Sequence, residues 1–332
     1  MAPFNNAAAL LALAASAGAL VAPRLHVARP GKASQLAAWK YDMTSVERAL
    51  DTERDACGVG FIAESKGGPS RRVMEAATNC LCANEHRGGC SADGISGDGS
   101  GIMTQIPWEV YEADTPRLKE RRAAHPGERM GCMTLFVPRD PEAAARAKEV
   151  VLEAAEATGF EVVAWRDTPV DASVCGVAAE LGRPDFAHVF LRTSADTPTR
   201  TERNFERALY LYRRSLRGAW DRDEELYVAS CSSKTTIYKG MVNAASLKLF
   251  YPDLQSEAYV SQFAIYHRRF STNTMPRWSL AQPFRLIAHN GEINTVRGNV
   301  NWMVSRAEAA GGDLGAIAAG CSSEDPDRAC EY

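Results

Sequence analysis

The sequence lacks the features that mark the specialised classes of protein. It has no dominating short repeat, which excludes collagen-like and coiled-coil designs. It also has no basic excess: 38 Lys and Arg stand against 41 Asp and Glu, giving a net charge of −3. This balance disfavours a general nucleic-acid binder. With 45% hydrophobic and 24% charged residues among 332, the composition is globular rather than disordered.

Cysteine is present, but without the pattern of a disulfide scaffold. The nine cysteines are an odd number at irregular spacing in a long chain, which indicates a reducing compartment. The pattern C-x-C-x3-H-x3-C over residues 80–90 has the ligand types of a zinc site. Two helical residues two positions apart point about 200° from one another, however. We therefore predict no metal ligands, and keep a truncated, non-catalytic or zinc-binding module as an alternative.

Long hydrophobic runs are missing except near the start of the chain. Residues 7–22 are uncharged and small or apolar, which is short for a membrane span and suits a signal-peptide core. Residues 24–41 are basic and free of acids, as in organelle transit peptides. We expect a signal-like segment over 1–23, a transit-like segment and propeptide over 24–56, and a plastid destination. A secretory signal or another organelle is the alternative, and the mature form would have no membrane segment.

Residues 57–332 are predicted to form one α+β domain, because no Pro- or Ser-rich linker divides them. Apolar residues at helical spacing predict helices over 70–86, 140–158, 205–216 and 301–310. Short apolar segments predict the strands, at 57–63, 102–106, 132–137, 162–165, 186–191, 226–230, 235–238, 263–270 and 284–289. The strands come in runs with helices between the runs, which is typical of layered α+β folds.

Three glycine-containing motifs are candidates for a functional role. The G-x-G-x-x-A at 58–63 is preceded by a polar segment and followed by a strand, which excludes a dinucleotide site. The GDGSG loop at 97–101 lacks the ending of a P-loop, and is a tight turn, an anion nest or a place of close substrate approach. The HNGE at 289–292 suits a hairpin turn. The same turn could present the Asn290 amide and the Gly291 N–H as an oxyanion hole.

Cys57 begins the first folded segment, directly after the removable leader. If the chain were cleaved between Ala56 and Cys57, the thiol would carry its own base, the α-amine. The unperturbed pKa values of the two groups are about 7.7–8.0 for the amine and about 8.5 for the thiol. The amine could therefore accept the thiol proton near neutral pH.

Five stretches together strongly resemble the class II glutamine amidotransferase domain of glutamate synthases, in that family's order: DACGVGFIA (55–63), NEHRGG (84–89), SGDGSGI (96–102), YHRRFSTNTMPRW (266–278) and AHNGEINTVRGNVNWM (288–303). The resemblance implies an N-terminal-nucleophile hydrolase fold, a four-layer αββα sandwich that is incomplete at its C-terminal end. Ser279 replaces a proline that is usual in the family. Because the chain ends at Tyr332, we expect a fragment or a synthase portion on a separate chain.

The resemblance also implies roles for individual residues. Cys57 would be the nucleophile, with Asn290 and Gly291 as the oxyanion-hole pair. The residues expected to bind glutamine are Arg269 at the α-carboxylate, Asn273 and Thr274 along the pocket, and Asp325 at the ammonium group.

By the same resemblance, the chain would hydrolyse glutamine through a Cys57 thioester to glutamate and ammonia. In the intact enzyme the ammonia would aminate 2-oxoglutarate. No cofactor is expected in this chain, whereas FMN and an iron–sulfur cluster are expected in the synthase portion. The expected partners are glutamine, that synthase portion, and ferredoxin or NAD(P)H as electron donor. The alternative within the family is an amidotransferase that serves another acceptor.

Overall fold

The computed structural model describes residues 58–193, 201–219, 226–269 and 276–286, together with positions 298, 301, 302 and 305. The chain divides into two compact units, Met1–Asp55 and Ala56–Tyr332, and everything described lies in the second. The expected leader segments, 1–23 and 24–56, lie outside the described residues. Within the ranges given, none of the helices has both the length and the apolar character that a membrane crossing requires.

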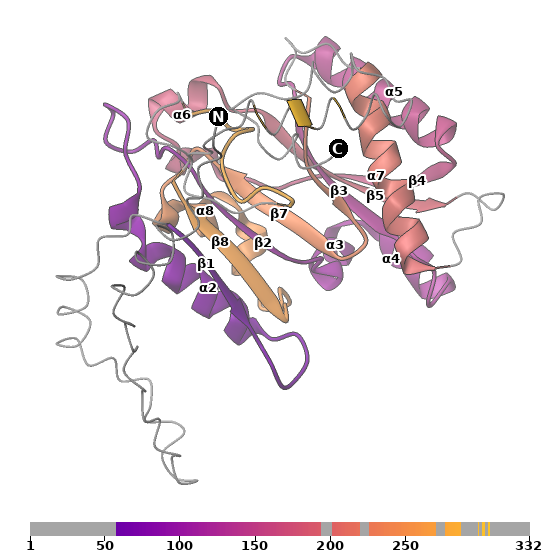
Figure 1. The fold of residues 1–332 in the computed structure, drawn as a ribbon, viewed down its shortest axis with the longest axis horizontal. Helices are drawn as coiled ribbons and strands as arrows, with labels where there is room; N and C mark the ends of the chain where they lie inside the picture. Colours follow the sequence, from indigo (N-terminus) through magenta and orange to yellow (C-terminus); the bar gives the residue numbers. More distant parts are fainter. Residues whose placement is uncertain are drawn as a thin grey trace, which may run out of the picture. The chain divides into compact units, whose positions relative to one another are not determined.

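In the part of the chain that the structure describes, eight strands form two antiparallel sheets of four strands each, and Figure 1 shows how they are arranged. The first sheet has the order β1-β8-β2-β7 and the second has the order β4-β5-β3-β6. The chain crosses from the second sheet to the first through the two-residue turn between β6 and β7. The strands are β1 (Val59–Ala63), β2 (Ser100–Gln105), β3 (Gly131–Val137), β4 (Phe160–Asp167), β5 (Asp185–Thr193), β6 (Tyr227–Ser232), β7 (Thr235–Gly240) and β8 (Phe263–Arg268).

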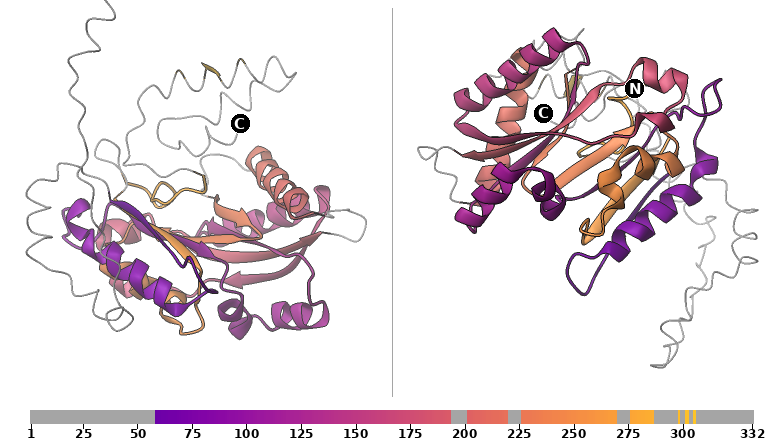
Figure 2. Two further views of the ribbon diagram at one scale, coloured as in Figure 1. Left: turned by 60° about the horizontal axis from the view of Figure 1, so that its bottom comes forward. Right: turned by 180° about the vertical axis from the view of Figure 1, so that it is seen from behind.

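Helices cover both sheets. In Figure 2, α2 runs along the first sheet, where it contacts β1 and β8, while α5 and α7 lie side by side against the second sheet. The α-helices are α2 (Arg71–Ala83), α3 (Trp108–Asp114), α4 (Pro116–Ala124), α5 (Pro141–Ala157), α6 (Val177–Leu181), α7 (Glu202–Ala219) and α8 (Ala244–Phe250). Three 3-10 turns complete the described elements: η1 (Glu85–Arg87), η2 (Ala172–Val174) and η3 (Pro252–Gln255).

The long helix α5 shows how the sequence sets an element's ends. The Asp140 carboxylate accepts a hydrogen bond from the Ala143 N–H at 2.9 Å, which satisfies one of the free donors of the first turn. Pro141 occupies the first helical position, where its missing N–H costs nothing. Gly159 follows the helix with φ +77°, a left-handed conformation that glycine adopts without strain.

The apolar core of the second sheet lies under α5 and α7. The α7 residues Phe205, Leu209 and Tyr212 are fully buried, as their helical spacing predicts. They pack in one cluster against outward-facing side chains of β3 and β5, including Met133, Leu135, Val189 and Leu191. A second cluster contains buried residues of α2, α8 and both sheets.

The predicted α+β architecture is confirmed, with one error in the strands. Residues 284–286 of the expected strand 284–289 do not form a β-strand. Instead Phe284 is buried against the Lys239 ammonium, and Arg285 donates to the Val228 carbonyl oxygen at 2.6 Å. These residues therefore contact β7, through Lys239, and β6, through Val228, without joining either sheet. Of the expected helix 301–310, the described positions 301, 302 and 305 are helical, and the rest lies outside the described residues.

A polar cluster is buried between the sheets and the helices α3 and α4. Its centre is Arg166, with a side chain that is 4% exposed. The guanidinium binds Asp253 through two hydrogen bonds of 2.8 Å and Asp114 through two of 2.6 Å. The Tyr238 hydroxyl donates to Asp253 at 2.6 Å. Burial by itself would lower the pKa of Arg166, but the hydrogen bonds to both carboxylates raise it above its ordinary value.

His188 belongs to the same cluster and is neutral. Its Nε2 lies 3.1 Å from the Tyr111 hydroxyl, and its Nδ1 lies 2.9 Å from the Thr168 hydroxyl. Burial lowers the pKa of His188 well below its ordinary value, and the neighbouring Arg166 charge lowers it further. Both ring nitrogens are therefore satisfied without a second cation next to the guanidinium.

Replacing Asp253 by asparagine should destabilise the fold strongly. The Arg166 charge would stay buried after losing a full partner, and such losses cost about 3–5 kcal/mol. Urea unfolding measures the free energy of unfolding. The control is Lys234→Gln, which breaks the exposed ion pair of Lys234 with Glu202 and should cost less than about 1 kcal/mol. Equal losses in the two variants would contradict the importance of the buried pair.

Stability should also fall as the pH drops from about 6.5 to 5. Because the folded-state pKa of His188 lies below its unfolded value, the unfolded chain binds the extra proton first. One such group contributes a slope of up to about 1.4 kcal/mol per pH unit. Urea titrations across this window should give a shallower slope for His188→Gln, and an unchanged slope for a control variant at the exposed His125, His125→Gln. An unchanged slope in His188→Gln would show that His188 is not the group responsible.

Candidate active site

The ends of three neighbouring strands meet at the position that follows Cys57. Strand β8 lies between β1 and β2 (Figure 1). At its end the Arg268 N–H donates to the Gly58 carbonyl oxygen at 2.7 Å, and the Arg269 N–H donates to the Gly99 carbonyl oxygen at 2.8 Å. The residue directly after Cys57 is thereby fixed beside the two arginines.

The glycines after Cys57 are required by close contact with β8. A Cβ atom on Gly58 would lie 2.0 Å from the Arg268 carbonyl oxygen, and one on Gly60 would lie 2.3 Å from the Tyr266 hydroxyl. Strand β1 follows the first of these glycines, and the next helix, α2, starts only at Arg71. The G-x-G-x-x-A pattern thus serves strand packing, as the exclusion of a dinucleotide site predicted.

Arg269 has an unusual backbone and an available side chain. Its φ is +108°, in the region that side-chain-bearing residues rarely adopt. Its Nε is buried and has no hydrogen-bond partner among the described residues, and the Asp98 Oδ2 atom lies 4.0 Å away from it. A guanidinium in this state suits a ligand carboxylate, which it can bind with two parallel hydrogen bonds.

Arg269 is the one predicted site residue that the structure describes. Six others lie outside the described residues: Cys57, Asn273, Thr274, Asn290, Gly291 and Asp325. Their predicted roles stay predictions.

Sequence reasoning missed Arg268, the neighbour of Arg269. Its side chain is fully buried, and the guanidinium binds Glu85 at 2.7 Å, Asp98 at 2.6 Å and the Asn243 side-chain oxygen at 3.1 Å. Glu85 and Asp98 belong to the stretches NEHRGG and SGDGSGI, so one guanidinium joins two of the recognised motifs to a third. The signal was present: the predicted strand 263–270 contains both arginines, and because successive strand residues point to opposite faces, one of the two was expected to point inward.

The glycines of those two motifs make room for this arrangement. A Cβ on Gly88 would lie 1.8 Å from Arg268 Cζ, and one on Gly97 would lie 2.5 Å from the Val242 carbonyl carbon. Gly99, with φ +144°, has a backbone conformation that other residues rarely adopt. In the GDGSG stretch, Gly97 forms an isolated bridge with Cys90 and Ser100 begins β2, and the Gly99 carbonyl oxygen between them accepts from the Arg269 N–H.

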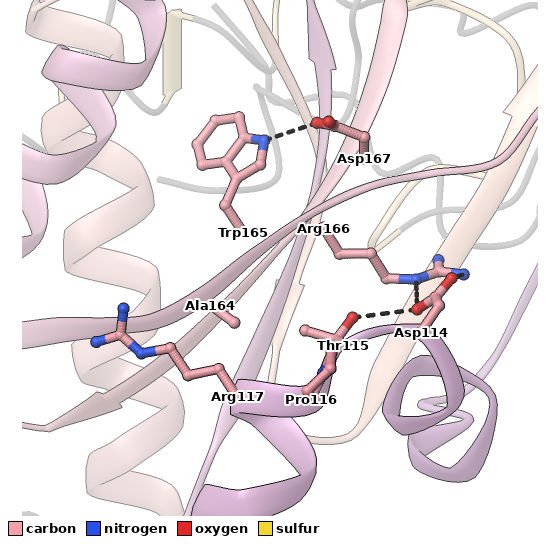
Figure 3. A pocket seen from close by; sticks show the side chains of 8 residues that line it. All are labelled: Asp114, Thr115, Pro116, Arg117, Ala164, Trp165, Arg166 and Asp167. Carbon is pink, nitrogen blue, oxygen red and sulfur yellow. Dashed lines mark hydrogen bonds and ion pairs between the residues drawn. The ribbon is translucent and has the colours of Figure 1, made fainter.

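An open cavity of about 430 Å³ lies elsewhere, between α3, α4 and β4 (Figure 3). Its walls include Trp165, whose indole N–H donates to Asp167 at 3.1 Å, and Asp114, which accepts from the Thr115 hydroxyl at 3.1 Å and from Arg166. These polar groups are bound to one another, and none belongs to the recognised motifs. The cavity shares Arg166 and Asp114 with the buried polar cluster, and none of its lining residues belongs to the candidate active site.

The family profile described as "Glutamine amidotransferases class-II" matches residues 57–316, the greater part of the chain. The chain belongs to this family. Membership confirms the predicted resemblance and the N-terminal-nucleophile α+β fold. Among the residues described, no group of three His, Cys, Asp or Glu side chains could hold a metal ion, so the zinc-module alternative gains no support.

Three similar proteins are glutamate synthases by name. The amidotransferase chain is 46% identical over 260 residues to "Ferredoxin-dependent glutamate synthase 2, chloroplastic" of Arabidopsis thaliana, covering 77% of this chain and 16% of that protein. It is 45% identical over 258 residues to "Ferredoxin-dependent glutamate synthase 2" of Synechocystis sp., with coverage of 77% and 16%. It is 41% identical over 256 residues to "Glutamate synthase [NADPH] large chain" of Azospirillum brasilense, with coverage of 76% and 16%. The chain thus spans 16% of the length of these relatives.

Adding a methyl group at Gly58 should disrupt the edge of the amidotransferase sheet. In Gly58→Ala the new Cβ meets a backbone carbonyl that cannot move aside, so we expect a loss of about 3 kcal/mol or more in the free energy of unfolding. Gly68→Ala is the matched control, because a Cβ at Gly68 meets nothing within 4 Å, and its effect should stay within about 1 kcal/mol. Thermal unfolding of both variants tests this. A Gly58→Ala variant as stable as Gly68→Ala would contradict the close approach.

Proposed function

We propose that this chain is the glutaminase part of a glutamate synthase. The observation that supports the proposal most directly is the pairing of strand ends: Gly58, the residue after Cys57, is hydrogen-bonded to Arg268, and Arg269 follows with an unpartnered Nε. A nucleophile at Cys57 would therefore lie one residue before Gly58, which is hydrogen-bonded to Arg268. Arg269, whose guanidinium is proposed to bind a carboxylate, comes directly after Arg268. Glutamine carries both groups that such a site needs, an α-carboxylate and a side-chain amide.

The proposed reaction begins when the Cys57 thiolate attacks the amide carbon of glutamine. Removal of residues 1–56 would give Cys57 a free α-amine, which accepts the thiol proton. Asn290 and the Gly291 N–H would stabilise the tetrahedral oxyanion, a contribution of about 2.7–4 kcal/mol per donor. The carbon–nitrogen bond then breaks, and the protonated α-amine returns its proton to the departing ammonia. Water cleaves the thioester and releases glutamate.

Substrate recognition is proposed to rest on charge. Arg269 would bind the α-carboxylate of glutamine with two hydrogen bonds, a geometry that lysine cannot reproduce. Asp325 would bind the α-ammonium group, and Asn273 and Thr274 would line the pocket. These assignments follow the family motif position by position.

In the whole enzyme, the ammonia would aminate 2-oxoglutarate. Seven relatives that are 40–46% identical to this chain are named for ferredoxin, whereas one at 41% identity is named for NADPH, so we propose ferredoxin as the electron donor. FMN and an iron–sulfur cluster would supply the electrons. By the resemblance to glutamate synthases, they would bind in the synthase portion. A plastid is the proposed location, in line with the chloroplastic relative and the two-part leader.

The test is glutamate release from glutamine by the full chain, together with the mass of its mature N-terminus. We expect a terminus at Cys57, hydrolysis by the wild type, and none by Cys57→Ala. Cys80→Ala is the control, because Cys80 is a half-buried free thiol on α2 with no predicted catalytic role. Full activity in a protein that retains residues before Cys57, or in Cys57→Ala, would overturn the mechanism.

A further inference from the structure

We propose that Arg268 is a positioning residue for glutamine binding: its buried guanidinium holds Asp98 and Gly99 so that Arg269 stays available for the substrate carboxylate. This inference rests on the proposed function, because it takes Arg269 to be the carboxylate-binding residue. It assigns Arg268 no contact with the substrate.

The Arg268 guanidinium is fully buried and fully engaged. Its Nε and Nη2 bind one oxygen of Glu85 at 3.2 and 2.7 Å, and its Nη1 binds Asp98 Oδ1 at 2.6 Å. Charge-assisted contacts of this kind are short and directional, which suits them to fixing a geometry. Asp98 is itself 13% exposed, so its position depends on its protein partners more than on water.

Arg268 is coupled to the backbone of Arg269 through one carbonyl group. The Gly99 oxygen accepts from Arg268 Nη1 at 3.1 Å and from the Arg269 N–H at 2.8 Å. Arg269 needs such support because its φ of +108° is unfavourable for a residue with a side chain. The guanidinium thus fixes the acceptor that holds the unusual backbone of its neighbour.

Arg268 also restrains a competitor of the substrate. The second oxygen of Asp98, Oδ2, lies 4.0 Å from Arg269 Nε, too far for a hydrogen bond but close enough to form one after a small movement. While Arg268 binds Oδ1, Asp98 is held at this distance. Without Arg268, the Asp98 carboxylate would be free to pair with Arg269 and occupy the site that the glutamine α-carboxylate needs.

The contact with Glu85 connects the same guanidinium to the rest of the domain. The other Glu85 oxygen accepts from the Ala244 N–H at 2.8 Å at the start of α8, and Asn243 accepts from Arg268 directly. Loss of Arg268 would therefore reduce stability as well as change the site. A test must separate these two effects.

The chain offers a matched control at Arg166. Arg166 is 4% exposed and paired with two carboxylates, as Arg268 is, but it lies in the polar cluster outside the candidate site. Arg166→Gln should lose stability and keep its KM for glutamine. In Arg268→Gln, glutaminase kinetics of the full chain should show a KM raised about tenfold or more, with kcat within about threefold, because ground-state and transition-state binding are lost together.

The second Asp98 oxygen gives the sharper test. If Asp98 competes with the substrate once Arg268 is gone, then adding Asp98→Asn to Arg268→Gln should lower KM again, since a neutral amide cannot neutralise Arg269. A merely structural role for Arg268 predicts the opposite, because the double variant loses a further buried contact. A double variant with a KM equal to or above that of Arg268→Gln would overturn the competition.

Gly88→Ala tests the inference without removing any charge, which matters if Arg268→Gln fails to fold. Its Cβ would lie 1.8 Å from Arg268 Cζ and must displace the guanidinium, so KM should rise as in Arg268→Gln. A diazoketone analogue of glutamine, which carries the α-carboxylate, should label Cys57 about tenfold more slowly in Gly88→Ala. Iodoacetamide, which carries no carboxylate, should label it at the wild-type rate.

The outcomes separate the two proposals. A wild-type chain that neither hydrolyses glutamine nor reacts with the analogue would overturn the proposed function itself. An active wild type with unchanged KM and analogue labelling in both Gly88→Ala and a folded Arg268→Gln or Arg268→Lys would overturn the role of Arg268 alone. An equal rise in KM in Arg166→Gln and Arg268→Gln would show that the change in KM follows from lost stability of the fold. That result would also overturn the positioning role of Arg268.

Discussion

The arrangement of the site depends on the close approach of two backbones. Gly58 and Arg268 come together where a side chain on the first would overlap the carbonyl oxygen of the second. That contact brings the start of β1 to the end of β8, and the bond from Arg269 to Gly99 then adds the end of the glycine-rich loop. Three segments that are far apart in sequence are thus joined by two main-chain hydrogen bonds. These bonds require no particular side chain, but they require that residue 58 has none.

Two buried arginines show how similar chemistry can serve different purposes in one domain. Arg166 is surrounded by Asp114, Asp253 and hydroxyl groups, and every contact it makes ends within the polar cluster. Arg268 also binds two carboxylates, but one of them, Asp98, has a second oxygen directed towards Arg269. The role of a buried ion pair therefore depends on what the second carboxylate oxygen faces. The geometry of the pair alone does not decide whether that role is only structural.

The sequence allowed much of this fold to be predicted, and physical reasons explain what it did not. Helices α5 and α7 have capping residues or a clear apolar stripe, so their existence could be predicted. Helix α4 buries only Leu118, and α8 has seven residues, so neither produces a strong periodic signal. The order β1-β8-β2-β7 could not be predicted, because it pairs strands across most of the domain.

The candidate site shows the same division. Resemblance to the family identified Arg269, but the role of its neighbour depends on which of two adjacent arginines points inward and on what it meets there. That is decided by packing: Gly88 leaves space for the Arg268 guanidinium, and Glu85 and Asp98 supply its partners. A list of motifs contains all of these residues without showing that one side chain joins them.

The pairing of β1 with β8 also determines how late in synthesis the first sheet can form. Val59 lies opposite His267, so about 200 residues must leave the ribosome after the first strand before its partner exists. At 5–20 residues per second, the thiol next to that strand waits about 10–40 s. During this interval the chain carries Gly58, but not the strand that places Arg268 beside it. The long separation therefore delays the pairing of β1 with β8 until most of the domain has been synthesised.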